Sequence, residues 1–153
     1  MKPLDSNDMG NKEDFVAHML RKADKRLQSA TRYYEAACAT DGDFDDAANR
    51  AYYAVFFSIL ALHTLDGKSF RRHGQAIGEF NKVYLKNNIF DRAYGEAITD
   101  LMICRHTSDY DVAQEISQYI MRENLLMAQK IVMDIQAYCF DKYPQVEAAY
   151  RKI

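Results

Sequence analysis

The octapeptide RHTSDYDV, Arg105 to Val112, places an arginine, a histidine, two aspartates and a tyrosine directly after the apolar run AITDLMIC. Side chains of these types can bind an anion or transfer a proton, so the stretch is a candidate active site. It can also be the polar end of one helix and the cap of the next, because Asp111 with Gln114 three residues later resembles a capping box. The residues of this stretch leave both interpretations open.

Arg105 continues an apolar seam by one further step of four residues, after Tyr94, Ile98 and Leu101. This spacing brings a guanidinium group to the edge of the core at the C-terminal end of a helix. A cation at that position also interacts with the helix dipole and the last free carbonyl groups, worth ~0.3–1 kcal/mol. A capping role is therefore the alternative to a binding role for Arg105.

A second arginine occurs in a similar setting. Asp46, Arg50, Tyr53 and Phe57 follow one another at 4-3-4 spacing, so they share one stripe of a helix whose other faces are apolar. The stripe predicts that Arg50 lies beside tyrosine side chains. The alternative is a solvated ion pair, since Asp46 and Arg50 are an acid and a base four residues apart.

The remaining motifs argue against several classes of site. His18, His63, His73 and His106 show no HxH or HExxH spacing, and Cys38, Cys104 and Cys139 are far apart. We therefore expect free thiols in a reducing compartment, with neither a metal ion nor a cofactor. No glycine-rich phosphate loop or GxSxG motif is present.

Composition limits the class of protein further. The 153 residues suit one domain, and a formal net charge of −2 gives no overall basic field, so nucleic-acid binding would need a local patch. The longest apolar run, about residues 51–62, is too short and too rich in tyrosine to span a membrane, and the N-terminal stretch has no apolar core. These features predict a cytoplasmic protein with no membrane association.

Helical periodicity and the scarcity of proline predict an all-α fold. Turn signals divide the chain into helices at about 12–39, 43–65, 72–85, 91–105 and 112–140, an up-and-down bundle of four to five helices. One domain should cover residues 12–143, with residues 1–11 and 144–153 loosely attached. The second helix is apolar on almost every face, so we expect it to be central or to contact another subunit.

Three segments in this order, DDAANRAYYAVFFSILALHTLDG, RRHGQAIGEFNKVYLKN and ITDLMICRHTSDYDV, resemble the HEPN domain over about residues 14–140. The resemblance rests on the run Arg50 to Ala54, on His73 and Phe80, and on Arg105 with Asp109 and Tyr110. It implies a small helical bundle that commonly dimerises.

Many HEPN proteins are metal-independent ribonucleases, often toxins paired with a nucleotidyltransferase-type antitoxin. The resemblance implies a site in which an arginine stabilises the charge on the phosphate and a histidine four to six residues later moves a proton. Arg105 matches the arginine, but Tyr110 stands where the histidine is expected. A tyrosine with a pKa of ~10 is a poor base at neutral pH, whereas histidine near ~6.5 is well suited.

Three hypotheses follow. In the first, a homodimeric module holds a nucleotide, an RNA end or a partner protein through Arg50, Tyr53, His73, Arg105, Asp109 and Tyr110. In the second, the protein is a metal-independent ribonuclease toxin in which Arg105 acts with His106 or Tyr110. A variant makes Tyr110 the acceptor of a nucleotidyl group from the antitoxin. In the third, the polar residues only cap helices and the bundle is a structural dimerisation unit.

Overall fold

The computed structural model describes residues 9–110 and 115–153, with side chains from Lys12 to His106 and from Glu115 onward. Over these residues the chain forms six α-helices and no strand, which confirms the all-α prediction. The elements are α1 Met9–Thr40, α2 Asp45–Leu65, α3 His73–Phe80, a π-helical turn Asn81–Leu85, α4 Ala93–Tyr110, α5 Gln118–Lys142 and α6 Pro144–Arg151.

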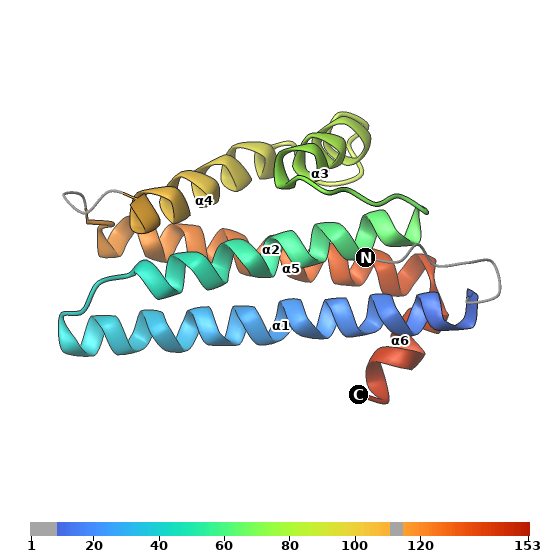
Figure 1. The fold of residues 1–153 in the computed structure, drawn as a ribbon, viewed down its shortest axis with the longest axis horizontal. Coiled ribbons are helices and arrows are strands. Elements are labelled where there is room, and N and C mark those ends of the chain that lie inside the picture. The colour runs from blue at the N-terminus through green and yellow to red at the C-terminus, as the bar shows by residue number, and fades with distance from the viewer. Residues whose placement is uncertain (1–8, 111–114) are drawn as a thin grey trace.

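Helix α2 lies at the centre of the bundle. It packs along α1 on one side and against α4 and α5 on the others, as Figure 1 shows. Its buried residues include alanines, aromatic rings and aliphatic side chains from several faces. The central position within one chain therefore accounts for the apolar character of this helix, and no second subunit is needed to explain it.

Helices α1 and α2 approach closely because small residues line their contact. Ala23 and Ala30 of α1 and Ala51, Ala54 and Ala61 of α2 are completely buried. The buried residues of α1 recur at intervals of three, four or seven along one face, and include Val16, Leu20, Ala23, Ala30 and Ala37. None of the described helices has both the length and the hydropathy needed to cross a membrane.

The boundaries of α4 and α5 differ from the prediction. Helix α4 continues to Tyr110 instead of ending near Arg105, because no glycine or proline interrupts the chain there. Helix α5 begins at Gln118, where the side chain of Ser117 accepts a hydrogen bond from the backbone N–H of Ile120 at 3.2 Å. The expected capping box at Asp111 and Gln114 lies outside the described residues.

The segment after Pro144 forms a packed helix, in contrast to the loose attachment suggested by its sequence. Val146 of α6 is completely buried, and the guanidinium carbon of Arg21 in α1 lies 4.2 Å from the centroid of the Tyr150 ring. The Tyr150 hydroxyl donates to the carboxylate of Asp24 on α1. Proline suits the first turn of a helix, because the N–H it lacks would have no helical partner there, so Pro144 begins α6 instead of ending the fold.

Helix α3 is fixed to the core by buried contacts along its length. The Nε2 atom of His63 on α2 lies 2.8 Å from the backbone oxygen of Ala76, and Phe80 is completely buried. Burial lowers the pKa of His63, which keeps its ring neutral and able to donate to that oxygen. These contacts determine where His73, the first residue of α3, lies relative to α2 and α4.

Candidate functional site

Arg105 projects from α4 onto two tyrosines of α2. Its Nη2 atom donates a hydrogen bond to the Tyr53 hydroxyl at 3.2 Å, and its guanidinium carbon lies 5.0 Å and 5.2 Å from the ring centroids of Tyr52 and Tyr53. The arginine is partly buried. A guanidinium over aromatic faces is held in place by about 0.5–1 kcal/mol for each such contact.

His73 joins the same group from the start of α3. Its Nδ1 atom lies 2.8 Å from the Tyr52 hydroxyl, and its ring stacks on Phe56 with centroids 3.9 Å apart. We refer to Tyr52, Tyr53, Phe56, His73 and Arg105 as the Arg105–His73 cluster. Helices α2, α3 and α4 therefore meet at this point. Helix α3 contributes His73 and α4 contributes Arg105, and both side chains face Tyr52 of α2.

The protonation states within the cluster follow from burial and charge. Burial raises the pKa of Tyr52 to about 12, so its hydroxyl keeps its proton at neutral pH. Burial, and secondly the positive charge of Arg105, lower the pKa of His73, so its ring is neutral. Since a phenol is a stronger hydrogen-bond donor than an imidazole N–H, Tyr52 donates to Nδ1, and the hydrogen of neutral His73 is on Nε2.

The N-terminus of α3 adds positive potential beside His73. The N-cap residue is Arg72, and no side chain caps the first backbone N–H groups of this helix. Arg71 and Arg72 are both exposed. Uncapped N–H groups, the helix dipole and neighbouring guanidinium groups all favour an anion. The start of α3 therefore carries positive potential next to His73.

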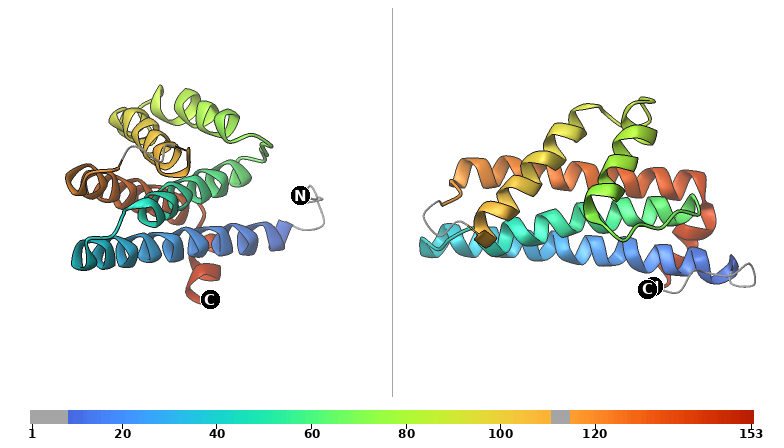
Figure 2. Two further views of the ribbon diagram at one scale, coloured as in Figure 1. Left: turned by 60° about the vertical axis from the view of Figure 1, so that its left-hand side comes forward. Right: turned by 45° about the horizontal axis from the view of Figure 1, so that its top comes forward.

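Two further cation–ring pairs flank the cluster along α2. The Arg50 guanidinium carbon lies 5.8 Å from the Tyr33 centroid, and the Lys22 ammonium lies 4.7 Å from the Phe57 centroid. We call these two pairs, together with Arg105 on Tyr53, the basic–aromatic strip. Arg50 and Phe57 are seven positions apart on α2, which makes the strip about 10 Å long. In the right-hand view of Figure 2, α1 and α2 run side by side and α4 crosses obliquely, with its C-terminal end near the start of α2.

The other residues proposed from the sequence lie in different settings. Arg50 shares the stripe with Tyr53, but its guanidinium turns to Tyr33 of α1. His106 is exposed and sits within the continuing helix, so its side chain points about 100° away from that of Arg105. Asp109 and Tyr110 end α4, and their side chains lie outside the described part of the chain.

The sequence analysis did not single out Tyr52 and Phe56. Each precedes a member of the stripe Arg50, Tyr53 and Phe57 by one position and therefore lies on a neighbouring face of the helix. On that face the sequence indicates only core residues. Tyr52 is 2 % exposed and Phe56 7 %, as expected of core residues, yet they hold His73. The pair of adjacent tyrosines that begins two positions after Arg50 was the available signal.

The cysteines and the acidic residues form no metal site in the described residues, where no three His, Cys, Asp or Glu side chains are grouped to bind an ion. Burial raises the pKa of Cys104 to about 11 and that of Cys139 to about 12. Both thiols therefore remain protonated at neutral pH and are poor nucleophiles.

Replacing Arg105 by methionine should raise the pKa of His73, because it removes the nearby positive charge. The pKa of folded His73 lies below its unfolded value of about 6.5, so the unfolded state binds more protons as the pH falls below that value. Neutral His73 therefore contributes stability above pH ~6.5 that is lost on acidification. NMR titration of the His73 ring protons in the wild type and in Arg105→Met measures the change in pKa. The control Arg151→Met, which removes a charge from α6, should leave the pKa of His73 unchanged.

Comparison with known proteins gives three findings. The family model of the HEPN domain matches residues 16–138. A Methanocaldococcus jannaschii protein named as a candidate toxin is 26% identical over 116 residues, which are 73% of this chain and 76% of that protein. A UPF0332 protein of Thermotoga maritima is 26% identical over 110 residues, 72% of this chain and 80% of that protein.

Proposed function

Because the chain belongs to the HEPN domain family, we propose that it is a binding module for a phosphate-bearing ligand, a nucleotide or single-stranded RNA. The observation that carries the proposal is the convergence of Arg105 and His73 on Tyr52. The guanidinium supplies positive charge, and the Nε2–H of neutral His73 supplies a hydrogen-bond donor. Arginine and N–H donors of this kind suit phosphate oxygens.

RNA is a better candidate than a mononucleotide because the basic–aromatic strip extends beyond the cluster. Single-stranded nucleic acids bind to surfaces that combine cations for the backbone with aromatic rings for the bases. Lys22 with Phe57 and Arg50 with Tyr33 provide such pairs on either side of Arg105. A strip about 10 Å long accommodates a ligand larger than one phosphate group.

The arrangement favours binding over cleavage. A general base must present an unprotonated atom, whereas Nδ1 of His73 accepts from Tyr52 and Nε2 carries the proton. His106, the alternative base, points away from Arg105 because α4 continues past it. Metal-independent ribonuclease activity is therefore the second candidate. It retains support from the family and from the relative named as a candidate toxin.

We further propose that the module works as a homodimer within a toxin–antitoxin or defence system, with a nucleotidyltransferase-type antitoxin as the expected partner. The name of the Methanocaldococcus jannaschii relative supports the toxin association. The dimer rests on the family resemblance, and light scattering of the purified protein tests it.

One assay separates the two candidate functions. The protein is mixed with a fluorescent ten-nucleotide single-stranded RNA in the presence of EDTA, and both anisotropy and RNA length are followed. The binding function predicts increased anisotropy with intact RNA, weakened by added salt because phosphate contacts release counterions. Cleavage at an enzymatic rate would support the ribonuclease instead. If the RNA is neither bound nor cleaved, both functions are excluded.

A further inference from the structure

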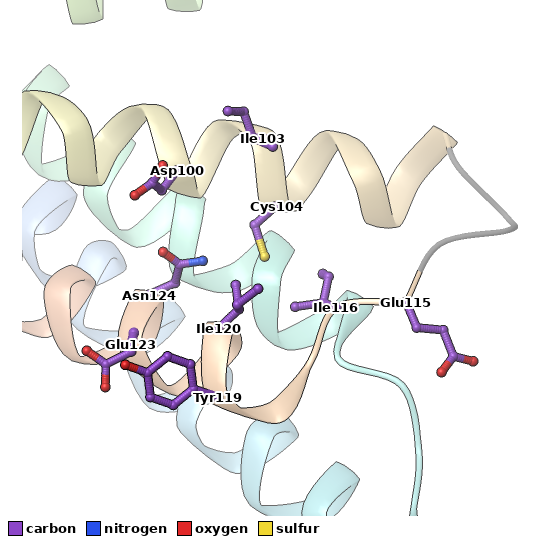
Figure 3. Close-up of a pocket in the computed structure, with 9 residues that line it drawn as sticks. All are labelled: Asp100, Ile103, Cys104, Glu115, Ile116, Tyr119, Ile120, Glu123 and Asn124. Carbon is purple, nitrogen blue, oxygen red and sulfur yellow. The ribbon is translucent and has the colours of Figure 1, made fainter.

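A hollow lies between α4 and the start of α5. It has a volume of about 430 Å³ and is lined by Asp100, Ile103, Cys104, Glu115, Ile116, Tyr119, Ile120, Glu123 and Asn124. Figure 3 shows Cys104 pointing from α4 toward Ile120 and Asn124, with Tyr119 and Glu123 on the α5 side. We call this hollow the α4–α5 groove. Ile103 and Arg105 are about 200° apart around α4, so the groove faces away from the Arg105–His73 cluster.

Large apolar side chains are exposed at the groove. Ile103 is 59% exposed, Tyr119 72% and Ile120 52%. The inward stripe of α5 is Met121, Leu125, Ala128, Val132 and Ile135, which leaves Ile120 at the surface. The apolar surface continues along α5 through Leu126 and Met133, which follow Tyr119 at intervals of seven residues and share its face.

The rim of the groove is acidic. Asp100, Glu115 and Glu123 are exposed, and no described lysine or arginine forms an ion pair with them. An adjoining hollow of about 360 Å³ shares Glu115 and Ile116 and adds Asp41 and Asp43. Five carboxylates therefore surround one end of an exposed apolar surface, and none of them forms an ion pair with a described lysine or arginine.

We propose that the α4–α5 groove binds a basic amphipathic helix of another protein. The distance from Tyr119 to Met133 is about 21 Å, the length of four helical turns. Apolar residues at i, i+3/i+4 and i+7 of the partner would cover Ile120, Tyr119 and Leu126, and flanking lysines or arginines would face the carboxylates. A second copy of this chain is the wrong occupant, since a two-fold contact would bring the acidic rims together.

The test uses two amidated 14-residue helical peptides that share one leucine stripe and carry either lysine or glutamate elsewhere. Binding to the full-length protein is measured by fluorescence anisotropy at two salt concentrations. The lysine peptide should bind, more weakly in higher salt, and should shift the NMR amide signals of α4 and α5. The glutamate peptide should not bind.

Two variants locate the interaction. Ile120→Asp and Asp100→Lys/Glu123→Lys should each weaken binding of the lysine peptide ten-fold or more, while Glu35→Lys/Asp141→Lys, equally exposed but elsewhere, should change it less than two-fold. Thermal melting confirms that the surface variants remain folded. Equal binding of both peptides, insensitivity to the groove variants, or a protein dimer that Ile120→Asp dissociates would overturn the proposal.

Discussion

Replacement of Arg105 by alanine should weaken the binding of single-stranded RNA by at least ten-fold. The guanidinium group is the charged donor of the cluster that the Tyr52 and Tyr53 rings hold in place. Hydrogen bonds that involve a charged group contribute about 1.5–3 kcal/mol, which corresponds to about 10–150-fold in affinity. Fluorescence anisotropy with labelled RNA in EDTA measures the change.

Arg151→Ala is the matched control for this experiment. It removes the same charge from an exposed residue of α6 that pairs with Glu147, so RNA affinity should remain within about two-fold of wild type. Arg105→Lys keeps the charge but loses the planar donor group, and should recover only part of the affinity. Unchanged binding by Arg105→Ala in a folded protein would refute the assignment of this site.

Replacement of Phe80 by alanine should have the largest effect on stability, lowering the free energy of unfolding by about 3–5 kcal/mol. Phe80 is completely buried, and its ring stacks against Tyr84 and Phe90 with centroids 5.7 Å and 5.8 Å apart. Alanine would leave a cavity at the C-terminal end of α3, where the π-helical turn begins. Urea unfolding followed by circular dichroism measures the loss.

Ile89→Ala is the comparison for Phe80→Ala. Ile89 follows the same turn but is 42% exposed, so its truncation should cost much less stability. Because α3 carries His73, Phe80→Ala should also weaken RNA binding, measured at urea concentrations below the unfolding midpoint of the variant. A loss of under 1 kcal/mol would mean that α3 contributes little to the core.

The sequence by itself determined the all-α class, the approximate extents of α1 and α2, and the apolar character of α2 on almost every face. These depend on helical periodicity and on which side chains avoid water, both of which are local properties of the chain. It also placed Arg105 at the edge of the core, where the structure has it partly buried against Tyr52 and Tyr53.

Only the tertiary structure decided what surrounds Arg105. His73 precedes Arg105 by 32 positions in the sequence. Its approach to Tyr52 depends on the packing of α3 on the core, through the contact of Ala76 with His63 of α2 and the burial of Phe80. The same is true of the α4–α5 groove, since the end of α4 and the start of α5 together determine that Ile120 faces outward. Periodicity specifies which face of a helix is apolar, but the crossing of helices specifies which polar groups meet.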